Sequence, residues 1–149
     1  MDYEQIEKAL LQYAGHNEKG FRDMLLMKAP FSLAFPTLKG PTGIGKTAMV
    51  EQFARNHGLL LQKWDAEGMA LEDLCATLSV FTERFMKAKN EGALFLIERF
   101  DMLDEASVAF LKAYTRGEAT ADVRVAGKGI VPVTVKRTPN LNLVAEITD

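Results

Sequence analysis

The segment of this sequence best suited to chemistry spans residues 40–47, which read GPTGIGKT and match the pattern G-x-x-x-x-G-K-[S/T]. Glycines let the main chain wrap closely around an anion and turn its N–H groups toward phosphate oxygens. Lys46 offers an ammonium group to the β and γ phosphates, and Thr47 offers a hydroxyl to Mg²⁺. The pattern predicts a site for magnesium and a nucleoside triphosphate, ATP or GTP. The predicted nucleotide-binding residues are Gly40, Pro41, Thr42, Gly43, Ile44, Gly45, Lys46, Thr47 and Ala48.

A second candidate is Glu98, which follows the apolar run ALFLI at residues 93–97. A continuous apolar run predicts a central strand that is covered on both faces. A phosphate-binding loop needs a carboxylate at the end of a neighbouring strand, to hold Mg²⁺ directly or through water. We therefore expect Thr47 and Glu98 to be the metal ligands.

The elements that must position these residues alternate between strand and helix patterns. Strands are expected at residues 35–39, 59–64, 93–97 and 140–148, and helices at 46–57, 71–90 and 104–114. A glycine-centred hairpin with alternating valines is expected near residues 119–136. Alternation of this kind predicts a three-layer α/β fold of the P-loop NTPase class, mostly a parallel sheet with helices on both faces. Residues 1–34 are expected to form a helical lead-in, and residues 35–149 the core of one structural domain.

Composition limits the classes of function. The 149 residues carry a net charge of −2, which gives no global attraction to nucleic acid or to anionic membranes. The single cysteine, Cys75, has leucines at helical spacing around it and is expected in the core. No signal peptide is apparent, and no apolar run approaches the ~20 residues that cross a bilayer. We expect a cytoplasmic protein without a membrane partner.

Several segments together resemble the nucleotide-binding core of an AAA+ ATPase, and within it the MoxR-like group. They are GPTGIGKT, the strand ALFLIER, the helix DEASVAFLKAYTRGEA and the closing NLNLVAEITD. The resemblance implies that the third strand should end in Asp-Glu, with the Asp supporting Mg²⁺ and the Glu polarising the attacking water. Glu98 stands at the first position and Arg99 at the second, so this Walker B motif is degenerate.

Arg99 cannot replace the family's glutamate, because a guanidinium stays protonated and only donates hydrogen bonds. Loss of general-base help typically costs 10²–10⁴-fold in rate, so we expect weak or partner-dependent hydrolysis. The catalytic residues are left undefined, with Glu98 and Arg99 as candidates. Arg99 is expected either against phosphate or exposed and paired with Asp101 or Asp104.

The resemblance also implies a polar residue at the end of the fourth strand, which would be Asp149 or, in another register, Thr148. The family's sheet order, 5-1-4-3-2, would leave the first strand at an edge. A fifth strand, a helical lid and an arginine finger are not expected within residues 1–149.

Three functions remain open from the sequence. The first is an ATP-binding AAA+ module that couples nucleotide state to remodelling of a protein partner, in a homo-oligomer or larger assembly. The second is a nucleotide-sensing or scaffold subunit that does not hydrolyse. The third is a small P-loop kinase, for which no lid segment is evident. The hairpin carries Arg124 and Lys128 and is either a contact surface for a partner or a solvated edge.

Overall fold

The computed structural model describes residues 3–4, 37–40 and 46–148 of the chain. The predicted lead-in helices and residues 41–45 of the phosphate loop lie outside this part, apart from a trace of helix at residues 3–4. The elements, in chain order, are β1 (Thr37–Gly40), α3 (Lys46–Asn56), β2 (Leu60–Asp65), α4 (Leu71–Lys87), β3 (Ala93–Glu98), the 3-10 turn η1 (Phe100–Met102), α5 (Glu105–Thr115), β4 (Glu118–Val125), β5 (Gly129–Lys136) and β6 (Leu141–Thr148).

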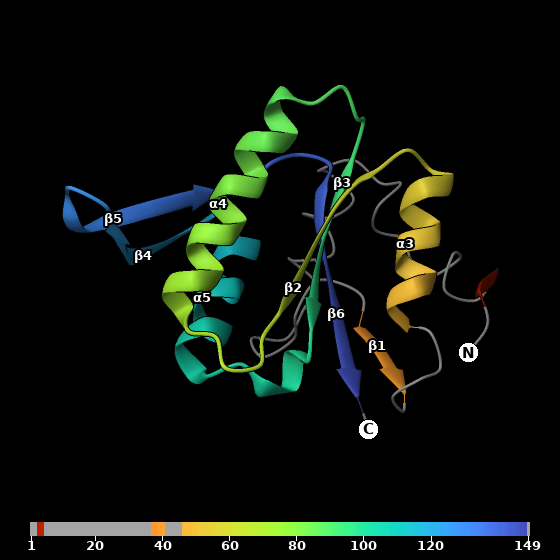
Figure 1. Ribbon diagram of the computed structural model, residues 1–149, viewed down its shortest axis with the longest axis horizontal. Helices are drawn as coiled ribbons and strands as arrows, with labels where there is room; N and C mark the ends of the chain where they lie inside the picture. The colour runs from red at the N-terminus through yellow and green to blue at the C-terminus, as the bar shows by residue number, and fades with distance from the viewer. Residues whose placement is uncertain (1–2, 5–36, 41–45, 149) are drawn as a thin grey trace.

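Four of the strands form one parallel sheet in the order β1-β6-β3-β2, so that β6 is inserted between β1 and β3 (Figure 1). This arrangement confirms the predicted parallel sheet, and among the described strands β1 is the outermost next to β6, as in the expected order. Because the strands are parallel, their carboxyl ends meet at one edge of the sheet, where ligands bind in open α/β folds. The last residues of β1, β6, β3 and β2 therefore lie together at the carboxyl ends of the strands.

Helices cover both faces of the sheet, which gives the three predicted layers (Figure 1). On one face α3 contributes Val50 and Phe53, both 0% exposed, to a cluster with Leu94 and Leu96 of β3. On the other face α4 and α5 pack against the alternate residues of β3, including Phe95. The first five residues of β3 are buried, which explains why this strand has a continuous apolar sequence instead of an alternating one.

Local sequence signals account for the helix ends. Gly58 has a φ of 64°, the left-handed conformation that lets the chain leave α3, and Leu59 N–H then donates to Ala54 O at 2.8 Å. At the start of α5, the Asp104 carboxylate accepts a hydrogen bond from Ser107 N–H at 2.7 Å. Asp104 is therefore the N-cap of α5.

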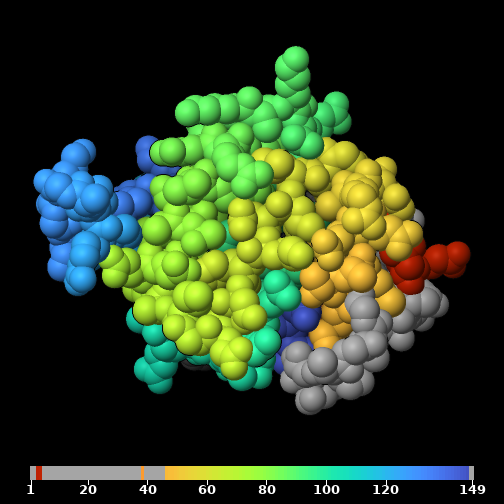
Figure 2. Space-filling view, viewed as in Figure 1, coloured from red at the N-terminus to blue at the C-terminus, as the bar shows by residue number. Residues whose placement is uncertain are grey.

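The hairpin of β4 and β5 forms a separate antiparallel sheet, which confirms its prediction near residues 119–136. One face of β4 is buried: Ala119, Ala121 and Val123 pack into the core cluster that α4 and α5 share. The far end, with exposed Lys128, extends beyond the body of the molecule (Figure 2). The hairpin is thus anchored at its base and free to make contacts at its tip.

Cys75 is 0% exposed within the core formed by α4, as its leucine neighbours predicted. Burial raises the pKa of its thiol, although a hydrogen bond from the backbone of Ala121 opposes the effect. Among the helices that the structure describes, none has the length and apolar character of a membrane span.

Candidate functional site

The candidate site is built around the side chain of Thr47, the last residue of the predicted phosphate loop. Its Oγ1 lies 2.7 Å from Oε2 of Glu146 and 3.3 Å from Oε2 of Glu98. These three residues come from α3, β6 and β3, which are far apart in the sequence. The structure therefore brings the two predicted metal ligands, Thr47 and Glu98, into contact and places the carboxylate of Glu146 beside them.

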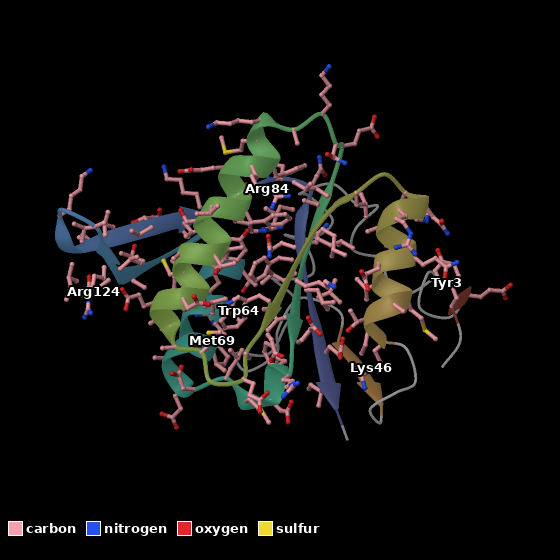
Figure 3. All side chains as sticks on the ribbon, in the orientation of Figure 1. Tyr3, Lys46, Trp64, Met69, Arg84 and Arg124 are labelled. Carbon is pink, nitrogen blue, oxygen red and sulfur yellow. The ribbon has the colours of Figure 1, made fainter. Side chains whose placement is uncertain are left out.

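The sheet topology explains why these groups meet. The amino end of α3 lies beside the carboxyl ends of β1 and β6 (Figure 1), and Lys46 is the first residue of that helix. Lys46 is only 4% exposed and lies beside β1 and β6 in the side-chain view (Figure 3). A helix amino end carries unpaired N–H groups and the positive end of the helix dipole, both of which favour an anion. The predicted nucleotide-binding residues 41–45 lie outside the described part. Ala48 is exposed on α3, and Gly40 ends β1.

The electrostatics of the site are unusual because two carboxylates share one hydroxyl. The pKa of Glu98 is raised above its ordinary value, first by partial burial and second by the negative charge of Glu146. The hydrogen bond from Thr47 opposes this increase, because it stabilises the charged carboxylate. A hydroxyl has one hydrogen and donates to one acceptor at a time, so with both carboxylates ionised one of the two contacts has no proton between its oxygens.

This donor set fits a hard divalent cation. Mg²⁺ prefers oxygen ligands and commonly binds through one or two carboxylates together with substrate phosphates and water. The described residues contain no group of three or more His, Cys, Asp or Glu side chains that could hold a metal. A cation beside Thr47 would therefore depend on the two carboxylates, the hydroxyl and oxygens supplied by a ligand, which is the pattern of a metal that arrives with nucleotide.

Arg99 pairs with acids other than Glu98 and Glu146. Its guanidinium forms ion pairs with Asp65, the last residue of β2, at 3.5 Å, and with Glu67, on the segment that follows β2. The expected partners, Asp101 and Asp104, are not those that the structure gives. Arg99 has a φ of 55° and a ψ of 47°, a left-handed backbone conformation that turns the chain directly after β3. A 3-10 turn follows, so the backbone leaves the sheet edge at this residue.

Asp65 has a turn-forming role at the end of β2. Its Oδ1 accepts a hydrogen bond from the N–H of Glu67 at 2.9 Å, the contact of an Asx turn. The Asp65 carboxylate also faces Arg99. These contacts hold Asp65 at the end of β2, opposite Glu98 and separated from β6 by β3.

Glu146 is the site residue that the sequence analysis missed. It occupies an otherwise apolar stretch of β6, where Leu143, Val144 and Ala145 are all at most 1% exposed, and it is itself 9% exposed. An acidic residue inside a buried strand is the signal that could have identified it, because a buried carboxylate needs a partner. The candidates proposed for this strand were Thr148 and Asp149. Thr148 pairs with Gly40 in the sheet, and Asp149 lies outside the described residues.

Comparison with known proteins supports the fold. No protein-family model matches the sequence, and no curated protein matches it either. Among solved structures, 117 chains match, one of them a mutant of RuvB from Thermotoga maritima. That structure superposes with a TM-score of 0.52 at 16% sequence identity and covers 99% of this chain. RuvB is an AAA+ P-loop ATPase.

The arrangement of helices and strands resembles that of this RuvB structure, which confirms the predicted three-layer α/β fold of the P-loop NTPase class. This chain spans 40% of the RuvB chain that it matches. At 16% identity the likeness concerns the arrangement of helices and strands, and it does not extend to the activity or partners of RuvB. The finer resemblance to the MoxR-like group is not addressed by this comparison.

Proposed function

We propose that this chain is an AAA+-type module, similar to the MoxR-like group, that binds magnesium and a nucleoside triphosphate, ATP in the first place. Residues 40–48 would hold the phosphates, with Lys46 against the β and γ phosphates and Thr47 and Glu98 at the cation. The observation that carries the proposal is the contact of Thr47 with carboxylates at the ends of two adjacent strands. A nucleotide-binding loop needs this juxtaposition of hydroxyl, acid and helix amino end.

Hydrolysis by the isolated chain is proposed to be slow. At the family's glutamate position stands Arg99, which cannot accept a proton and whose guanidinium is engaged with Asp65 and Glu67. When bound, Mg²⁺ would neutralise charge on the phosphates and orient them. Lys46 and Thr47 would bind and position the nucleotide and its cation. Arg99 would not activate the attacking water. Catalysis would then depend on a partner or on a neighbouring copy.

The proposed role of the module is to convert nucleotide state into a change of shape that remodels a protein partner. The hairpin supports this role, because its base packs on α4 and α5 and its tip carries Arg124 and Lys128. Ile130, also on the hairpin, is 63% exposed, an apolar side chain that a partner could cover. Residues 1–34 are proposed to form a lead-in to the core at 35–149.

A thermal-shift titration tests the binding proposal. A ligand that binds the folded state at 100 times its Kd stabilises it by about 2.7 kcal/mol. We expect magnesium-ATP to raise the Tm of the parent chain and of Lys128→Ala, an exposed lysine at the hairpin tip. Lys46→Ala should fold and show no increase. A parent chain that is folded and shows no shift with either ATP or GTP would contradict the proposal.

A phosphate-release assay tests the proposal that the isolated chain hydrolyses nucleotide slowly. The parent chain alone should release phosphate far below one per second. A rate of several per second that Lys46→Ala abolishes would refute slow hydrolysis.

The engagement of Arg99 also favours a second candidate, a nucleotide-sensing subunit that never hydrolyses. Nucleotide binding without phosphate release, even in the presence of the partner, would select it.

A further inference from the structure

We propose that Glu146 is a second carboxylate of the magnesium-nucleotide site and holds the cation jointly with Glu98 and Thr47. This inference rests on the proposed nucleotide-binding function and deepens it. With two carboxylates at the cation, nucleotide binding should depend on Mg²⁺ more strongly than it would at a site with a single carboxylate. The closing experiment separates its failure from that of the proposed function.

The first argument is the geometry around Thr47. Glu146 Oε2 is the nearer of the two carboxylate oxygens, at 2.7 Å against 3.3 Å for Glu98 Oε2. One hydroxyl hydrogen cannot serve both acceptors. With both acids ionised, three oxygen atoms from three elements converge around a single hydroxyl hydrogen, and a small cation would satisfy all three at once. The motif-defined metal ligand, Thr47, is at the centre of this group.

The second argument is the register of the sheet. Glu146 pairs with Leu38 of β1, and Ala145 pairs with Ile97 of β3, so the residue after Ile97, Glu98, lies beside Glu146. Side chains alternate between faces along a strand. Leu38 belongs to the cluster on the α3 face, and Glu146 contacts Thr47 of α3. The two acids therefore point to the same face and toward the same helix end.

The third argument is burial. Glu146 is 9% exposed, and Leu143, Val144 and Ala145, which precede it on β6, are at most 1% exposed. A mostly buried carboxylate is unfavourable unless it is paired, hydrogen-bonded or bound to a metal. A Thr47 hydroxyl shared with a second carboxylate is weak compensation. A divalent cation would neutralise both acids.

The charge balance sets the expected behaviour. The described part of the site offers two carboxylates and the single ammonium of Lys46 to a polyanionic triphosphate. Without Mg²⁺ the carboxylates repel the phosphates, and with Mg²⁺ they attract the cation that the phosphates carry. Glu146→Gln keeps the size of the side chain and one acceptor oxygen but removes its charge. It should bind nucleotide more tightly without the cation and gain less from its addition.

The test measures the Kd of a fluorescent ATP analogue with EDTA and with saturating Mg²⁺, using the full chain. The observable is the ratio of the two Kd values, because a purely structural defect changes both values together and leaves the ratio unchanged. The parent and Glu118→Gln, an exposed acid on β4, serve as controls. Glu146→Gln is expected to reduce the ratio at least about tenfold, which corresponds to about 1.4 kcal/mol.

A second variant covers the case in which Glu146→Gln fails to fold, as judged by circular dichroism. Glu146→Asp keeps the charge and shortens the reach, so it should lose the gain from Mg²⁺ without binding more tightly in EDTA. A ratio within twofold of that of Glu118→Gln, for whichever variant is folded, would overturn the inference while leaving the proposed function intact. A folded parent chain that binds no nucleotide in either condition would instead refute the proposed function, and this inference with it.

Discussion

Placing at position 99 the glutamate that the AAA+ resemblance implies should not produce efficient hydrolysis. In the structure the Arg99 side chain pairs with Asp65 and Glu67, and the carboxylates beside Thr47 are those of Glu98 and Glu146. The backbone at Arg99 is left-handed and is followed at once by a 3-10 turn. A glutamate placed there by Arg99→Glu would begin from the same backbone and face the same loop.

The magnitude of the stability change follows from the ion pairs that are lost. Both pairs are partly exposed: Arg99 is 43% exposed, Asp65 42% and Glu67 56%. Exposed pairs are each worth about 0.2–1 kcal/mol, so losing two costs about 1 kcal/mol. Arg99→Glu then places three acids together, which adds repulsion of similar size. The total, about 1–2 kcal/mol, corresponds to a decrease in Tm of roughly 3–6 °C for a chain of this size.

The assay combines thermal unfolding with phosphate release for the parent, Arg99→Gln and Arg99→Glu. Arg99→Gln removes the charge alone and should lose about half as much stability, without a change in turnover. We expect Arg99→Glu to hydrolyse magnesium-ATP within about tenfold of the parent rate. An increase of 10² or more, the typical value of general-base help, would refute the reasoning and show that residue 99 reaches the attacking water.

Three further predictions concern the fold. Phe53→Ala, in the fully buried cluster under α3, should reduce the free energy of unfolding in urea by about 3–5 kcal/mol. Asp104→Ala removes the cap on Ser107 N–H and should lower the Tm by a few degrees. The pKa of Asp104 is lowered by that hydrogen bond, so the loss should be present at neutral pH and vanish as the pH falls through the folded-state value. Cys75, with a raised pKa and no exposure, should react with iodoacetamide at pH 8.5 at least about tenfold more slowly in the native chain than in urea.

The sequence predicted the fold well because the governing signals are local. Every predicted strand and helix within the described residues is present, with ends displaced by a few residues: the helix expected at 71–90 is Leu71–Lys87. The apolar run at 93–97 predicted a central strand, and β3 is buried between two layers of helices. The order of the strands followed from the family resemblance and not from any local pattern.

The candidate site was predicted only in part, because its geometry depends on which strands become neighbours. The contact between Thr47 and Glu98 was inferred from the motif and is present in the structure. Glu146 was missed because its role arises from the insertion of β6 between β1 and β3, a long-range feature. The partners of Arg99 were wrongly chosen for a similar reason: Asp101 and Asp104 are near in sequence, whereas Asp65 lies on an adjacent strand.

Isothermal titration calorimetry with Mg²⁺ and a non-hydrolysable ATP analogue tests the central claim most directly. The account predicts saturable heat with one nucleotide per chain for the parent, loss of that heat in Lys46→Ala, and retention of it in Lys128→Ala. A folded parent chain that gives no binding heat, or a Lys46→Ala variant that binds as tightly as the parent, would contradict the account.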